Sequence, residues 1–86
     1  MAVPAEILRA ERIVYDAMPA DYVEMAHIDR GGRDLGWTAR ARVPRMGKRG
    51  QLLGRGSEEV IGQGDTPEEA ARSLVEFYEY RREGKI

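Results

Sequence analysis

Cysteine is absent from the sequence, and histidine occurs once, at position 27. Without cysteine the chain can form no disulfide, no thiolate nucleophile and no zinc site built on cysteine. The longest apolar runs hold two or three residues, as in Ile13-Val14-Tyr15, whereas a membrane-spanning helix needs roughly 20. The N-terminus also lacks the basic start and apolar stretch of a secretion signal. We therefore expect a cytoplasmic protein that makes no contact with a membrane.

An excess of either charge is missing too. Charged residues are 34% of the chain, but the formal net charge is −1, which argues against a protein that binds nucleic acid over its whole surface. Twelve of the fourteen basic residues are arginine, either because the genome is GC-rich or because planar guanidinium groups were selected. Hydrophobic residues make up 42% of the 86 residues, so we expect one folded domain over residues 1–86.

The first segment with helical periodicity is residues 4–18. Its apolar side chains recur three or four residues apart, and Leu8, Tyr15 and Met18 widen the apolar stripe. Pro19 stops the helix because it disfavours the helical conformation of the residue before it. Such a helix is too short to be stable alone in water, so we expect it to dock on another element.

The second predicted helix, residues 67–82, begins at a capping box. The hydroxyl of Thr66 is expected to accept a hydrogen bond from the backbone amide of Glu69, whose carboxylate reaches back to the amide of Thr66. Gly62 and Gly64 stand just before this start. We expect them to let the chain turn sharply from the last strand into the helix.

Three stretches between the helices have the character of strands: residues 22–28, 35–43 and 58–63. The glycine pair 31–32 makes a good hairpin connection between the first two, because glycine reaches positive φ without a steric penalty. Pro44 is expected to end the second strand. The sequence thus predicts an α+β fold in the order α-β-β-β-α, with a three-stranded antiparallel sheet packed against the helices.

The segment before the third strand, residues 45–57, holds four glycines and shows neither a helix nor a strand pattern. We interpret it as a basic, glycine-rich flexible loop or as the tip of an extended hairpin. Loops of this length in a compact domain are often functional.

Basic residues gather in and beside this loop. Between Leu35 and Ser57 there are six cations and no acid. The segment is either a solvated strand face with a flexible tip, or a surface that binds nucleic acid or an acidic partner. Aromatic side chains that could stack on bases are missing from the arm itself, and Trp37 at its base is expected to be buried. This favours an acidic protein partner. The candidate binding residues are Arg40, Arg42, Arg45, Lys48, Arg49 and Arg55, with Leu52 and Leu53 as a pair that either anchors a partner or folds back onto the sheet.

Residues that would carry catalysis are scarce. His27 has no nucleophile or metal partner marked in the sequence, so a structural role is expected. Asp29 and Asp34 flank one turn, which is common turn chemistry rather than a metal site. Gly62-x-Gly64 lacks the remainder of a dinucleotide-binding fingerprint. We therefore expect no catalytic residue, no metal, no cofactor and no enzymatic activity.

Residues 36–75 resemble the N-terminal domain of HicB antitoxins. Gly36-Trp37-Thr38-Ala39 leading to Val43-Pro44 is similar to one strand of that family, and Gly64-Asp65-Thr66-Pro67-Glu68-Glu69-Ala70 is similar to its helix start. Residues 22–28 would match the first strand of the family, which extends the resemblance over residues 22–75. The resemblance implies a non-enzymatic protein that binds and silences a small ribonuclease toxin. Residues 1–20 have no counterpart in the family, the basic loop is longer here, and the chain ends at Ile86 without a separate DNA-binding domain, so operator binding is not expected.

The order of elements is also similar to that of the double-stranded RNA-binding domain. In that family the last helix often begins with Gly-x-Gly-x-Ser-Lys-Lys-x-Ala, and residues 62–66 with Ala70 fit this frame. Pro67 and Glu68 stand where the two lysines contact phosphate, so the RNA-binding mode of that family is not expected.

The sequence leaves two functional hypotheses. The first is a small binding protein that docks on and inhibits a protein partner, as an antitoxin or as an inhibitor from a phage or other mobile element; a toxin ribonuclease or another nuclease is the candidate partner. The alternative is a nucleic-acid-binding module that uses residues 40–55. Self-association into a homo-oligomer is expected through a free sheet edge or through the aromatic residues Phe77, Tyr78 and Tyr80 of the last helix.

Overall fold

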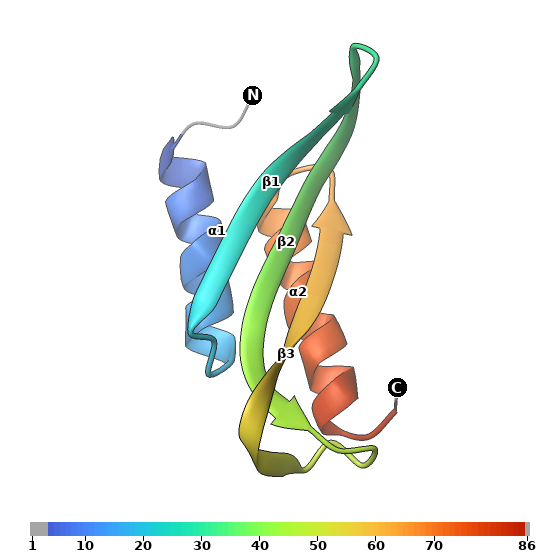
Figure 1. Ribbon diagram of the computed structural model, residues 1–86. Coiled ribbons are helices and arrows are strands. Elements are labelled where there is room, and N and C mark those ends of the chain that lie inside the picture. The colour runs from blue at the N-terminus through green and yellow to red at the C-terminus, as the bar shows by residue number, and fades with distance from the viewer. Residues whose placement is uncertain (1–3, 86) are drawn as a thin grey trace.

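The computed structural model describes residues 4–85 and has an α+β fold. The chain runs through α1 (Pro4–Ala17), β1 (Tyr22–Arg30), β2 (Arg33–Met46), β3 (Leu52–Gly64) and α2 (Pro67–Arg82). The strands form an antiparallel sheet in the order β1-β2-β3, with α2 behind it and α1 beside β1 (Figure 1). The predicted α-β-β-β-α order is confirmed. Within residues 4–85, none of the helices is long and apolar enough to cross a membrane.

The hydrophobic core lies between the two helices and one face of the sheet. Alternate residues of β2 point into it, and Ala39, Ala41 and Val43 are buried. Val14 of α1 and Leu74 of α2 are fully buried in the same cluster. Neither helix covers the opposite face of the sheet, so the side chains on that face are exposed to solvent.

The first helix buries a narrower stripe than the sequence predicts. It ends at Ala17, one residue early, and Val14 and Met18 are buried. Leu8 and Tyr15, however, keep 66% and 47% of their surface exposed. These two side chains lie outside the stripe that packs on the domain.

The aromatic residues of α2 do not form one exposed face. Tyr78 is buried, and Phe77 is partly buried against the core. Tyr80 is 43% exposed, with the Lys85 ammonium 5.5 Å from its ring centroid. The helix therefore offers Tyr80 and part of Phe77, rather than three aromatic side chains, for self-association.

Gly62 and Gly64 serve the packing of α2 rather than a sharp turn. Both lie in β3, and neither has a positive φ. A Cβ on Gly62 would overlap the backbone nitrogen of Leu74, and one on Gly64 would lie 2.6 Å from the nitrogen of Ala70. The predicted turning role is wrong, because what these positions require is the absence of a side chain where the helix backbone meets the strand.

The predicted cap of α2 is present, with one difference. Thr66 Oγ1 accepts from the amide of Glu69 at 3.1 Å, and Pro67 takes the first helical position. The Glu69 carboxylate accepts from the amide of Asp65 at 3.0 Å instead of from that of Thr66. The bounds of this helix agree with the predicted 67–82.

The Thr66 cap should contribute measurably to stability. We expect Thr66→Ala to lower the free energy of unfolding by about 1 kcal/mol, because the amide of Glu69 loses its acceptor. Thr66→Ser keeps the hydroxyl and serves as the control. Urea unfolding followed by far-ultraviolet circular dichroism measures both; equal stability of the two variants would contradict the capping role.

The strands are longer than predicted: β1 extends to residue 30, β2 covers 33–46 and β3 covers 52–64. Pro44 does not end β2. The carbonyl of Arg42 accepts from the amide of Asp21 at 3.1 Å on the side of β1, where the pairing ends at Tyr22. Two residues later the backbone of Pro44 faces the same side, beyond the end of β1, where no strand needs its missing N–H.

Candidate binding surface

The β2–β3 turn, residues 47–51, is held against the C-terminal end of α2. Arg81 Nη1 donates to the carbonyl of Gly47 at 2.6 Å, and its Nη2 donates to that of Met46 at 2.7 Å. Arg82 donates to the carbonyl of Gly50. Of the two alternatives for residues 45–57, the extended hairpin is confirmed, because residues 45–46 belong to β2 and residues 52–57 to β3, so the expectation of a loop without strand structure is wrong.

Glu58 of β3 binds both Arg81 of α2 and the backbone of β2. Its Oε2 lies 3.2 Å from Arg81 Nε, and its Oε1 accepts from the amide of Met46 at 2.7 Å. The side chains of Arg81 and Glu58 are only 19% and 23% exposed. One carboxylate and one guanidinium thus join both strands of the hairpin to the helix, with several charge-assisted hydrogen bonds.

Close packing of the turn depends on Gly50. Its φ is 80°, and a Cβ at this position would overlap the backbone carbonyl of Arg82. The sequence shows Arg81 and Arg82 only as favourable charges at a helix end. Their contact with the turn could not be predicted, because it depends on how far the hairpin reaches along α2.

A wide bulge interrupts β3 just after the turn. The pairs Pro44↔Ser57 and Met46↔Leu52 enclose Arg45 alone on β2, but residues 53–56 on β3. We call residues 53–56 the β3 bulge. Its two glycines, at 54 and 56, have φ near +80° and bracket Arg55. Residues 53–56 have no partner in the ladder with β2.

The bulge sets which side chains face solvent. Val43 and Met46 are both buried although they are three residues apart, so the direction of the side chains changes at Arg45, which is exposed. Leu52 and Leu53 are 49% and 46% exposed. They are not part of the core, and Leu52 lines a hollow together with Val43 and Pro44 of β2.

The uncovered face of the sheet carries Arg40 and Arg42 of β2. In the register of the strands, Arg40 lies between Glu24 and Ile61, and Arg42 lies between Tyr22 and Glu59. Arg42 Nε also pairs with Asp21 at 3.0 Å, and its guanidinium is 5.9 Å from the ring centroid of Tyr22. This face is mixed in charge, because acids alternate with the two arginines.

The predicted site residues therefore fall into three neighbouring groups. Arg40 and Arg42 lie on the uncovered sheet face, Lys48 and Arg49 lie on the turn, and Arg45, Leu52, Leu53 and Arg55 lie at the bulge. All eight are exposed. Of the six cations, only Arg42 has an ion-pair partner within residues 4–85. A hollow of about 300 Å³ lies beside the bulge, with Asp21, Pro44, Leu52 and Arg55 in its lining.

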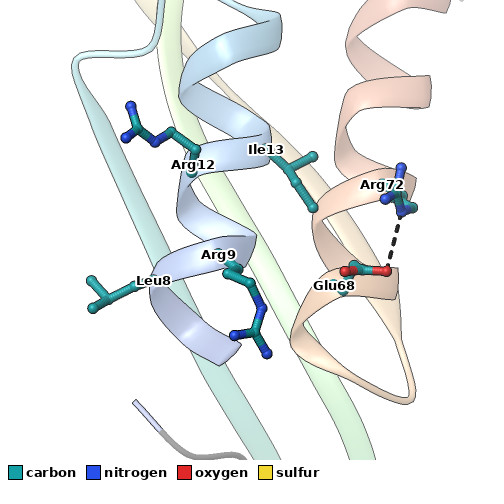
Figure 2. A pocket seen from close by; sticks show the side chains of 6 residues that line it. All are labelled: Leu8, Arg9, Arg12, Ile13, Glu68 and Arg72. Atoms are coloured by element: carbon teal, nitrogen blue, oxygen red, sulfur yellow. Dashed lines mark ion pairs between the residues drawn. The ribbon is translucent and has the colours of Figure 1, made fainter. Parts of the chain in front are cut away.

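A second concave region, which the sequence analysis missed, separates α1 from α2. It has a volume of about 470 Å³ (Figure 2). Ile13 points across it from α1, and Arg72 and Glu68 of α2 form an ion pair of 3.5 Å at its other side. Only the packing of the two helices brings these residues together, so no pattern in the sequence marks the groove.

The opposite end of the sheet carries the one histidine. His27 Nε2 is 3.0 Å from Asp34 Oδ1, and its ring centroid is 5.1 Å from that of the buried Trp37. Asp34 Oδ1 also accepts from the amide of Gly36 at 2.8 Å. The hydrogen bond from Gly36 and then that from His27 hold the pKa of Asp34 below its usual range. These contacts tie the β1–β2 hairpin together, and within residues 4–85 no group of acids and histidine is arranged to hold a metal ion.

The lowered pKa of Asp34 gives a pH-dependent contribution to folding. Because the folded pKa lies below the unfolded value of about 3.9, the stabilisation is complete above that value and is lost as the pH falls through the folded pKa. We expect the amide proton of Gly36, followed by NMR, to titrate with a midpoint below about 3.9. Asp34→Asn should remove this transition, and a midpoint at or above about 3.9 would contradict the account.

A scan against family models, a search of curated proteins and a search of solved structures each found no match. Two resemblances therefore stay predictions. One is that of residues 22–75 to HicB antitoxins, and the other is that of the element order to the double-stranded RNA-binding domain.

Proposed function

We propose that this chain is a small binding protein, without catalytic chemistry of its own, that docks on an acidic surface of another protein and blocks it. The observation that carries the proposal is the β2–β3 end of the sheet, residues 45–57. There, half-exposed Leu52 and Leu53 stand among cations that lack ion-pair partners within the described residues. A protein surface that combines apolar anchors with arginine is typical of an interface.

The hydrogen bonds from Arg81 and Arg82 to the β2–β3 turn, which we call the clamp, support the same function. Ordering a flexible arm during binding reduces affinity, whereas an arm already held in place avoids that loss. The excess of cations on this end selects an acidic partner and speeds its encounter. The resemblance to HicB antitoxins suggests a toxin ribonuclease or another nuclease as the partner, and a cytoplasmic location belongs to this proposal.

Leu53→Glu tests the proposed docking surface. Capture from an extract of the native host, quantified by mass spectrometry, should recover a stoichiometric partner with the wild-type chain. Leu53→Glu should weaken this partner's binding by about 30-fold or more, as expected for loss of a central anchor. Leu35→Glu is the matched control, because Leu35 is 52% exposed at the far end of the sheet.

Two further results decide the proposal. The recovered partner, once purified, should lose its activity when the wild-type chain is added. The proposal is wrong if both leucine variants retain the partner equally, or if the bound partner keeps full activity.

The second candidate function is nucleic-acid binding by the same end of the sheet. The four cations of residues 45–57, together with Arg40 on the adjoining sheet face, have no ion-pair partner in the described part of the chain and favour it. If it holds, Arg45→Glu combined with Arg49→Glu abolishes binding to bare RNA or DNA, and the wild-type affinity falls steeply between 50 and 200 mM salt, as is general for phosphate contacts. Fluorescence anisotropy with labelled oligonucleotides measures both, and no binding at low salt removes this candidate.

A further inference from the structure

The side of α1 that faces away from the domain has an apolar and charged stripe of its own. Leu8 and Tyr15 are 66% and 47% exposed, and Glu11 and Arg12 lie between them on the helix. The four side chains line a shallow hollow of about 410 Å³. Figure 2 shows Leu8 and Arg12, which also border the groove between α1 and α2, pointing away from α2, whereas Ile13 points toward it. Docking α1 on its own domain needs one apolar stripe, so this second stripe has no role in the fold.

The stripe is complementary to itself. Its members are spaced three, four and seven residues from Leu8, so they share one face of the helix. If two copies of α1 pack antiparallel about a two-fold axis between residues 11 and 12, Leu8 faces Tyr15 of the second copy. Glu11 then faces Arg12 of the second copy, and the symmetry repeats both contacts. Every apolar side chain meets an apolar one, and every charge meets its opposite.

We infer that α1 is a homodimerisation surface and that its partner is α1 of a second copy of this chain. Glu11 and Arg12 have no ion-pair partner within residues 4–85, so both are available for this contact. An antiparallel pair also aligns the two helix dipoles favourably. The contact is isologous, as in the commonest class of oligomer.

The size of the stripe sets the strength of the dimer. Four side chains from each copy form a contact far smaller than the roughly 20 residues a side of a stable interface. We therefore expect a weak dimer, formed in the upper micromolar range of protein concentration.

The residues proposed to bind a partner lie on β2 and β3 and are separate from this stripe. The dimer thus carries two copies of the proposed binding surface, residues 45–57, which raises avidity for a partner with two sites.

Charge exchange between Glu11 and Arg12 tests the pairing. Sedimentation equilibrium should show a concentration-dependent dimer for the wild-type chain and at least tenfold weaker association for Glu11→Arg and for Arg12→Glu alone. An equimolar mixture of these two variants should regain the dimer, because the basic stripe of one then faces the acidic stripe of the other. A chain carrying both substitutions should also dimerise.

Arg9→Glu is the control for net charge, because it makes the same change on α1 outside the stripe. Alone it should dimerise like the wild-type chain, and mixed with Glu11→Arg it should form no tighter heterodimer than Glu11→Arg does with the wild-type chain. Far-ultraviolet circular dichroism confirms that each variant is folded. A contact of this size should be detectable at about 1 mM protein. A wild-type chain that stays monomeric up to about 1 mM would therefore overturn the inference. So would single variants that associate as well as the wild-type chain, or a Glu11→Arg and Arg12→Glu mixture that does not.

Discussion

Arg81→Ala should lower the free energy of unfolding by about 3 kcal/mol, more than the exchange of any charged residue within residues 45–57. The substitution removes the donors that satisfy the carbonyls of Met46 and Gly47, and it leaves Glu58 largely buried without its cation. The partial exposure of the pair moderates the loss, which places it at the lower end of the range for broken buried ion pairs. Equilibrium unfolding in urea, followed by circular dichroism, measures it.

Two matched variants separate this clamp from a general effect of charge. Arg72→Ala removes an exposed arginine whose pair with Glu68 spans 3.5 Å, and it should change stability by less than about 0.5 kcal/mol. Arg81→Lys keeps the charge but cannot reach two carbonyls and a carboxylate at once, so it should recover only part of the loss. Equal effects of Arg81→Ala and Arg72→Ala would show that the clamp contributes nothing.

Gly62→Ala should be the most damaging small substitution in the sheet. In an ordinary strand, alanine in place of glycine would be favourable by about 0.5–1 kcal/mol, because glycine loses more conformational freedom on folding. Here the added Cβ would lie 2.6 Å from the Ala70 carbonyl oxygen and 2.7 Å from the Leu74 Cα. These are backbone atoms of α2 and cannot rotate aside, so the whole helix must shift from the core.

We therefore expect Gly62→Ala to lower the free energy of unfolding by about 3 kcal/mol or more, or to prevent folding. Gly47→Ala is the control, because the atoms nearest to its Cβ would be those of the Gln51 side-chain amide, which can move, and the backbone there has no positive φ. It should stay within about 0.5 kcal/mol of the wild-type chain. A Gly62→Ala protein as stable as Gly47→Ala would mean that α2 does not pack against β3 as closely as described.

The sequence predicts the two helices and the order of elements well, because these depend on local signals. The Thr66 cap and the spacing of apolar residues act within one or two turns of chain. The extent of β2 and β3 could not be predicted in the same way. Pro44 is a strand breaker in the middle of a sheet, and it is tolerated here only because β1 has already ended beside it.

The candidate site was predicted in composition but not in conformation. All eight predicted residues are exposed, yet the glycine-rich segment that holds most of them is a bulged hairpin rather than a loop. Its order comes from Glu58 and Arg81, which are 23 residues apart in the chain. The helix-facing glycines and the second stripe of α1 likewise become visible only when the elements are packed.

Backbone order in residues 47–57 of the free chain tests the central claim most directly, since the proposed surface works by being held in place before a partner arrives. NMR relaxation of their amides should give order parameters near 0.85, as in the rest of the sheet, and Arg81→Ala should lower them. Values below about 0.6 in the wild-type chain would show a flexible arm and would contradict the account.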